Sequence, residues 1–184
     1  MKQSTFSAVM ANSIKNLLQG YTKGIRFVAV LTMLLIVGIK SAWGETYTKV
    51  TSAPSDWSGE YLIVYETGKV AFNGALTTLD AEKNTISVTI SDGTITTTDA
   101  NASFTIAKSG SNYIIKSASG YYIGWSTADK NGLNANSKYS ANYYLNTISN
   151  SIISGVKGTL KYNKTADQKR FRYYQSGQED IALY

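Results

Sequence analysis

The feature that most constrains the fold lies between residues 45 and 184. This region consists of short runs of β-branched and aromatic residues, separated by Gly, Asn and Ser. Several runs alternate between apolar and polar positions, as half-buried strands do. No stretch of the region has the i, i+3, i+4, i+7 apolar spacing of an amphipathic helix. The pattern predicts an all-β domain in which short hairpins form a barrel or a sandwich.

One hairpin is indicated directly by its turn. Thr85–Ile90 and Thr94–Thr98 alternate on either side of Asp92-Gly93, and Asp and Gly both tolerate the positive φ of a type I′ turn. Tyr143–Leu145 is expected to be another short strand. The polar, Asn-rich segment Ser126–Ser140 is expected to be a long loop, which at that length is either functional or mobile.

Three ungapped segments of the chain are similar to one another. Each has two aliphatic residues, then a glycine, then another short strand: Tyr61–Asn73 with Gly68, Tyr113–Trp125 with Gly120, and Ser151–Asn163 with Gly158. One hairpin cannot bury its own apolar face, so such units must pack together. Three such units around a common axis are the plan of a β-trefoil, and the segment 113–123 resembles the repeat of that fold. Another barrel or a sandwich is the alternative.

The first 44 residues are typical of a secretory signal peptide. They contain no acidic residue, an apolar run of 13 residues from Phe27 to Ile39, and the small residues Ala42 and Gly44 just before Glu45. A membrane-spanning helix needs about 20 apolar residues, so a cleaved, helical signal peptide is favoured over a signal anchor or a buried helix. Translation from Met10 instead of Met1 would give the leader a more usual length. We therefore predict a signal peptide (1–44) and a single all-β domain (45–184) that is secreted, periplasmic or on the cell surface.

The net charge of +6 belongs mostly to this leader. Residues 45–184 hold 13 basic and 12 acidic residues, a net charge of +1. The domain therefore lacks the broad cationic field that duplex nucleic acid requires. After cleavage no membrane span is expected.

Composition also argues against most enzyme classes. The chain has no His and no Cys, so a Ser-His-Asp triad, a cysteine nucleophile and a thiolate zinc site are excluded. It has neither an Asp-x-Asp-x-Asp-Gly loop for calcium nor a glycine-rich phosphate motif. The carboxylate pairs Asp80/Glu82 and Glu179/Asp180 are interpreted as solvated turn acids, not as the acid pair of a glycosidase. We expect a non-enzymatic protein without catalytic residues, metal or cofactor.

Aromatic residues suggest a ligand. The region 45–184 contains 13 Tyr and two Trp, whose rings stack on sugar faces and whose OH and NH groups bind sugar hydroxyls. We predict a sugar site at the start of the long loop, formed by Trp125, Tyr121, Tyr122, Asn131 and Asn134. The alternative is that these rings fill a small β core.

A basic segment near the end of the chain is a second candidate. If residues 169–174 form a strand, Arg170, Arg172 and Tyr174 face the same way. Such a face could bind a carboxylate, a sulfated glycan or a single nucleic-acid strand. Alternatively, the two Arg side chains only solubilise the outer face of a half-buried strand and protect a sheet edge.

Several motifs along the region 45–184 resemble a known family. They are Y-T-K-V-T-S (Tyr47–Ser52), D-W-S-G-E-Y-L-I-V-Y-E (Asp56–Glu66), A-F-N-G (Ala71–Gly74), Y-Y-I-G (Tyr121–Gly124), N-G-L-N (Asn131–Asn134) and Q-K-R-F-R-Y-Y (Gln168–Tyr174). Together they resemble a poorly characterised β-domain of secreted proteins from anaerobic gut bacteria. The resemblance implies an accessory module, sometimes joined to Ig-like domains or secreted nucleases, and implies no catalytic residues.

The expected function is therefore binding of a carbohydrate or another cell-surface ligand by aromatic stacking. A structural or protein-interaction domain of adhesin type is the first alternative. An accessory domain of a secreted hydrolase or nuclease system is the second. The expected partner is a glycan or a surface protein, and the oligomeric state is left open.

Overall fold

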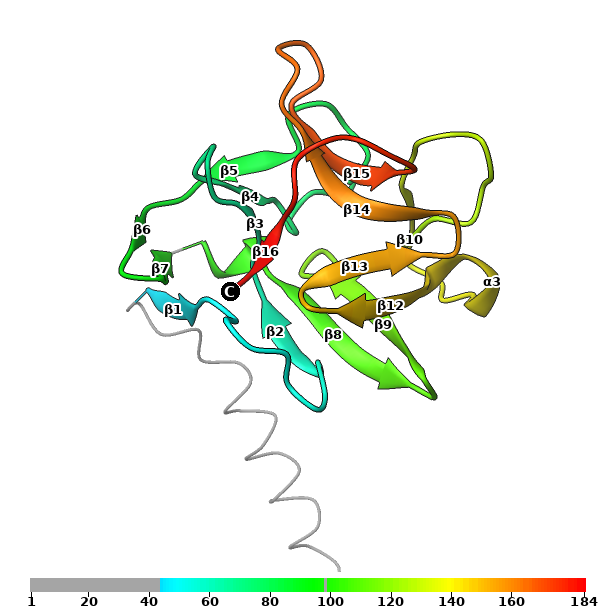
Figure 1. The fold of residues 1–184 in the computed structure, drawn as a ribbon, viewed down its shortest axis with the longest axis horizontal. Helices are drawn as coiled ribbons and strands as arrows, with labels where there is room; N and C mark the ends of the chain where they lie inside the picture. The colour runs from blue at the N-terminus through cyan, green and yellow to red at the C-terminus, as the bar shows by residue number, and fades with distance from the viewer. Residues whose placement is uncertain (1–43, 98) are drawn as a thin grey trace, which may run out of the picture. The chain divides into compact units, whose positions relative to one another are not determined.

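A computed structural model describes residues 44–97 and 99–184; the predicted signal peptide lies outside the described residues except for Gly44. All described residues fall within one compact unit. They form mostly β-strands, together with one single-turn α-helix, α3 (Ala141–Tyr144), and one 3-10 helix, η1 (Ala100–Ala102) (Figure 1). The prediction of an all-β domain is confirmed.

The strands form three antiparallel sheets. The first has the order β1 (Glu45–Thr48), β7 (Thr94–Thr97), β6 (Ile90–Ser91). The second has the order β16 (Ala182–Leu183), β3 (Ile63–Tyr65), β4 (Val70–Phe72), β5 (Thr85–Ser87). The third and largest has the order β11 (Asn134–Asn136), β10 (Tyr122–Gly124), β9 (Asn112–Ser117), β12 (Leu145–Ser149), β13 (Ile152–Gly155), β14 (Gly158–Asn163), β15 (Arg170–Tyr174). Two more strands of this sheet lie off this path: β8 (Phe104–Ser109) pairs with β9 and also with β2 (Gly59–Tyr61).

These sheets do not close into a barrel within the described residues, so the predicted barrel is wrong. The reason is that one continuous segment contributes to two different sheets, so its pairing with either sheet is short. The segment 59–65 is divided at Leu62: its first part, β2, pairs with β8, and its second part, β3, pairs with β16. Leu62 itself exchanges two main-chain hydrogen bonds with Tyr184, at 2.9 and 3.1 Å.

The predicted hairpins are present. Asp92 and Gly93 have φ values of 49° and 71° and connect β6 to β7, as a two-residue primed turn requires. The three similar segments also form antiparallel hairpins: β3–β4 with Gly68 in its turn, β9–β10 with Gly120 in its turn, and β13–β14 with Gly158 as the first residue of β14.

Three local predictions are wrong. The strand expected at 85–90 is split into β5 and β6, and the long loop 126–140 contains the short strand β11. Residues 143–144, expected to be extended, belong to α3. In this last case packing overrides the strand preference of Tyr, since the helical turn buries Tyr144 to 6 % exposure while Tyr143 stays in solvent.

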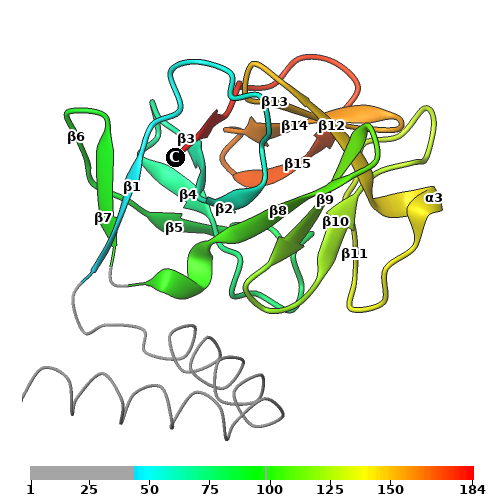
Figure 2. The same cartoon turned by 90° about the horizontal axis from the view of Figure 1, so that it is seen from below.

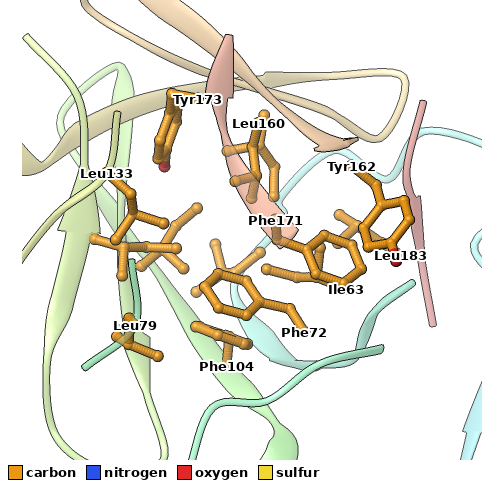
Figure 3. Packing of buried hydrophobic residues seen from close by; sticks show 14 of the residues in the cluster. Ile63, Phe72, Leu79, Phe104, Leu133, Leu160, Tyr162, Phe171, Tyr173 and Leu183 are labelled. Atoms are coloured by element: carbon orange, nitrogen blue, oxygen red, sulfur yellow. The ribbon is translucent and has the colours of Figure 1, made fainter. Parts of the chain in front are cut away.

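The core is built around three phenylalanine rings (Figure 3). Phe72 of β4 lies between Phe104 of β8 and Phe171 of β15, with ring centroids 4.7 and 5.3 Å away. All three side chains are fully buried. Such aromatic contacts stabilise beyond the area that they bury, and here they join two of the sheets.

One buried polar residue connects segments distant in the sequence. Asn84 is fully buried. Its Nδ2 donates to the carbonyls of Leu79 (2.7 Å) and Phe171 (2.9 Å), and its Oδ1 accepts from the N–H of Phe171 (2.8 Å). The side chain thus replaces a strand partner for β15.

Candidate functional site

Four tyrosines contact one another where β10 meets α3. Figure 2 shows α3 beside β10 and β11 at one side of the domain. The tyrosine cluster consists of Tyr122 on β10, Tyr139 after β11, and Tyr143 and Tyr144 on α3. The ring centroid of Tyr122 lies 5.5 Å from that of Tyr139, in an edge-on arrangement, and 6.4 Å from that of Tyr144. Tyr143 and Tyr144 are 6.2 Å apart. The rings therefore contact one another as a group, in geometries that aromatic pairs favour.

In this cluster one ring is buried, one is half-buried and two are exposed to solvent. Tyr144 is buried and Tyr122 is half-buried, whereas Tyr139 and Tyr143 are 40 % and 49 % exposed. Among the residues that the structure describes, the exposed large hydrophobic side chains are these two tyrosines together with Ile152 and Val156. All four fall between residues 139 and 156, so the exposed apolar surface comes from one stretch of the chain.

Two features hold the tyrosine cluster in place. Gly124 lets α3 approach β10: a Cβ at this position would lie 2.2 Å from the carbonyl oxygen of Tyr143. Asn146, which is 1 % exposed, donates from Nδ2 to the carbonyls of Ile123 (3.1 Å) and Tyr144 (3.2 Å). Its Oδ1 accepts from the hydroxyl of Tyr173 at 2.7 Å. One amide therefore links β10, α3 and β15 beneath the open rings.

Burial affects the ionisation of two tyrosines that lie beneath the open rings. Burial raises the pKa of Tyr144 above its usual value, and the neighbouring Tyr143 raises it further. Burial alone raises the pKa of Tyr173. The Nζ of Lys116 lies 5.2 Å from the ring centroid of Tyr122, a cation–π distance. A ligand would meet phenol rings with one positive charge beside Tyr122.

Trp125, the centre of the predicted sugar site, organises its own loop. The indole is half-buried, and its Nε1 donates to the carbonyl of Lys130 at 3.1 Å. The ring lies against Gly132, where an added Cβ would come within 2.2 to 2.6 Å of three ring carbons. The indole N–H and part of one ring face are thus already used by the chain.

The other predicted sugar-site residues lie near Trp125 but have separate surroundings. Tyr121 is half-buried and packs against the main core. Asn131 is exposed, and its Oδ1 accepts from the N–H of Gln175 at 3.1 Å. Asn134 is half-buried on β11, opposite Gly124. Of this predicted group, only Tyr122 belongs to the tyrosine cluster.

The predicted basic face of β15 is covered. Arg170 and Tyr174 are 8 % and 4 % exposed, and Arg172 is half-buried. Arg172 forms a two-pronged ion pair with Asp80, at 2.6 Å from Nε and 2.8 Å from Nη2. Arg170 lies 3.7 Å from Glu82, donates to the carbonyl of Asp80 at 3.3 Å, and bonds Gln168. Both cations serve to fix the 80–82 turn onto β15.

The remaining carboxylates considered from the sequence also have basic partners. Glu179 pairs with Lys164 at 2.7 Å, and Asp180 pairs with Lys161 at 2.5 Å. Within residues 44–97 and 99–184, no cluster of three or more Asp and Glu residues could hold a metal ion.

Sequence reasoning missed Tyr139, Tyr143, Tyr144 and Asn146. The available signal was the presence of three tyrosines within six residues of a polar segment. Their convergence on Tyr122 depends on α3, which no helical periodicity indicates, because a single turn is too short to show one.

No helix in the described part of the chain is long and apolar enough to span a membrane. Comparison of the chain with family models, curated proteins and solved structures gives no significant match.

Proposed function

We propose that the protein is a non-enzymatic carbohydrate-binding module and that the tyrosine cluster is its binding surface. The observation that carries the proposal is the pair of open rings: Tyr139 packs edge-on against Tyr122, and Tyr143 packs against Tyr144. Asn146 holds Tyr144 in place through its carbonyl. Exposed aromatic rings offer apolar faces to the C–H groups of a sugar, and their hydroxyls can bind sugar hydroxyls. Because the rings pack against each other, binding would lose little side-chain entropy.

This proposal moves the stacking surface away from Trp125. The indole N–H of Trp125 is bonded to Lys130, so its contribution is to shape the loop beside the cluster. The ion pairs of Asp80, Glu82, Glu179 and Asp180 favour structural roles for these carboxylates and support a binding function over hydrolysis.

A glycan-binding experiment tests the proposal. Purified protein is screened on a glycan array and then titrated with a retained polysaccharide by calorimetry. Tyr143→Ala and Tyr139→Ala should each weaken binding about tenfold, the loss expected for one stacking ring. Ile152→Ala is the matched control, since Ile152 is 51 % exposed and lies outside the cluster. Failure of the wild-type protein to retain any glycan, or equal affinity in the Tyr and Ile variants, would contradict the proposal.

The second candidate is a protein-interaction domain of adhesin type. Ile152 and Val156, which are 51 % and 57 % exposed, favour it because aliphatic side chains do not stack on sugars. The β13–β14 turn that carries Val156 also bonds the residue after β10: the N–H of Lys157 donates to the carbonyl of Trp125 at 3.2 Å. Loss of a protein partner in Ile152→Ala and Val156→Ala, with no glycan retained by the wild type, would establish this candidate.

We further propose that the protein is exported and that the domain has trefoil-like internal symmetry. The leader pattern in residues 1–44 supports export, and N-terminal sequencing of the protein from the producing cells should give Glu45 as the first residue. The three hairpins around Gly68, Gly120 and Gly158 support the symmetry. An experimental structure in which they superpose by successive thirds of a turn about one axis would establish it, and unrelated rotations would exclude it.

A further inference from the structure

A cavity lies on the side of the domain away from the tyrosine cluster. Its volume is about 460 Å³, and it is lined by β1, by β2 and by Tyr184. Strand β1 and helix α3 are on opposite sides of the domain in both views (Figures 1 and 2). A volume of this size lies within the range of small-molecule sites, roughly 300 to 1,000 Å³.

The lining of this cavity is acidic and aromatic. Glu45 and Glu60 supply two carboxylates, Tyr47, Tyr61 and Tyr184 supply three phenol rings, and the described lining contains no Lys or Arg. Aromatic faces and carboxylates both attract positive charge. The walls are thus suited to a cation and unsuited to an anion.

Both carboxylates point toward one hydroxyl. The Oη of Tyr47 lies 2.7 Å from Oε2 of Glu45 and 3.4 Å from Oε1 of Glu60. Burial raises the pKa of Tyr47, and its bond to Glu45 raises the pKa further, so the ring stays a neutral donor. Glu60 also accepts from Ser103. Two negative groups are therefore held near one another by neutral donors.

Neither carboxylate has a cationic partner among the described residues. The ion pairs there use other acids, and the nearest comparison is Glu66, which is paired with Lys49 at 2.7 Å and accepts from the hydroxyl of Tyr184. On this wall of the domain, Glu66 is paired with a lysine, whereas no described Lys or Arg side chain pairs with the half-buried Glu45 or the exposed Glu60.

We propose that this cavity binds an organic cation, namely an ammonium or quaternary ammonium group, between Glu45 and Glu60 and against the half-buried ring of Tyr61. The cation would bridge two carboxylates that otherwise repel one another. The aromatic face of Tyr61 would replace part of its hydration. The site is independent of the proposed glycan surface, because no residue is shared between them.

The experiment is a titration of the full-length protein followed by NMR chemical shifts. The probes are choline and Nα-acetyl-lysine methylamide, and the neutral control is Nα-acetyl-norleucine methylamide, which keeps the lysine stem without the charge. We expect millimolar binding of at least one cationic probe, with shifts at β1 and β2, and none of the norleucine derivative. Preference for choline would assign a quaternary ammonium ligand, and preference for the lysine derivative a primary amine.

Paired variants separate the contribution of the carboxylate charge from that of the aromatic ring. Glu60→Gln keeps an acceptor for Ser103 and should weaken binding of the cationic probe about five- to tenfold. Glu179→Gln lies outside the cavity and should leave this affinity unchanged. Tyr61→Phe keeps the ring and should bind the cationic probe nearly as well as the wild type does. Tyr61→Leu lacks the ring and should bind the probe more weakly. The proposal would be overturned if neither cation binds at millimolar concentration, if the norleucine derivative binds equally well, or if Glu60→Gln retains full affinity with an unchanged fold.

Discussion

Asn84 and Phe171, 87 residues apart in the sequence, are joined by two hydrogen bonds between the side-chain amide of the first and the main chain of the second. We expect Asn84→Ala to lower the free energy of unfolding by about 3 kcal/mol, because it leaves buried main-chain groups without partners. Urea denaturation measures this change. Asn142→Ala, at an exposed position, should change stability by less than about 0.5 kcal/mol; similar values for both variants would show that the Asn84 bonds contribute little.

A second prediction concerns the two-pronged ion pair between Arg172 and Asp80. Arg172→Lys keeps the charge but cannot make two parallel bonds to one carboxylate, so it should cost about 1 kcal/mol of stability. Lys164→Met breaks the more exposed pair with Glu179, in which Lys164 is 67 % exposed, and should cost less than half of that. Equal losses in the two variants would show that the forked geometry adds nothing.

The all-β class and the hairpins could be predicted because their signals are local. Alternating residues around Asp92-Gly93 specify a strand–turn–strand unit through φ preferences and side-chain period alone. The same holds for the hairpins at Gly68, Gly120 and Gly158.

The arrangement of the sheets could not be predicted, because it depends on pairings between distant segments. Nothing near Leu62 indicates that its two sides pair with residues 104–106 and 182–183. The candidate site was only partly predicted for the same reason. Tyr122 was identified, but the contact of Tyr139 with it depends on the path of the chain after β11. The position of Tyr143 depends on α3, which docks on Gly124.

A third prediction tests the role of Trp125. Gly132→Ala places a Cβ in the volume of the indole ring, so it should shift the Trp125 indole N–H resonance and weaken its bond to Lys130. Gly120→Ala is the comparison: its φ of 93° makes alanine unfavourable, but no atom lies within 4 Å of the added carbon. The free energy of unfolding of Gly120→Ala should fall by about 1 kcal/mol, while the indole resonance should stay in place. An unchanged indole resonance in Gly132→Ala would refute the close packing.

A fourth prediction concerns acid stability. Burial raises the pKa of Glu66, but hydrogen bonds from Lys49 and Tyr184 outweigh this and lower it overall. A carboxyl whose folded-state pKa is depressed stabilises the fold above its unfolded pKa of about 4.5, and this contribution is lost as the pH falls through the folded-state value. Since the side chain is 38 % exposed, the contribution should be below about 1 kcal/mol.

Thermal unfolding measured from pH 7 down to pH 3 checks this prediction. Glu66→Gln should be less stable than the wild type at neutral pH and should lose less stability on acidification. Asp167→Asn, at an exposed position, should follow the wild-type curve. Parallel acid curves for Glu66→Gln and the wild type would count against the assigned coupling.

The division of the segment 59–65 between β8 and β16 also affects when the domain can fold. Until the ribosome has added residues 182–184, β3 can pair only with β4, and the edge of β3 that β16 covers stays open. An open apolar strand edge invites aggregation. The second sheet and the hydrogen bonds between Leu62 and Tyr184 are therefore complete only after the last three residues have been synthesised.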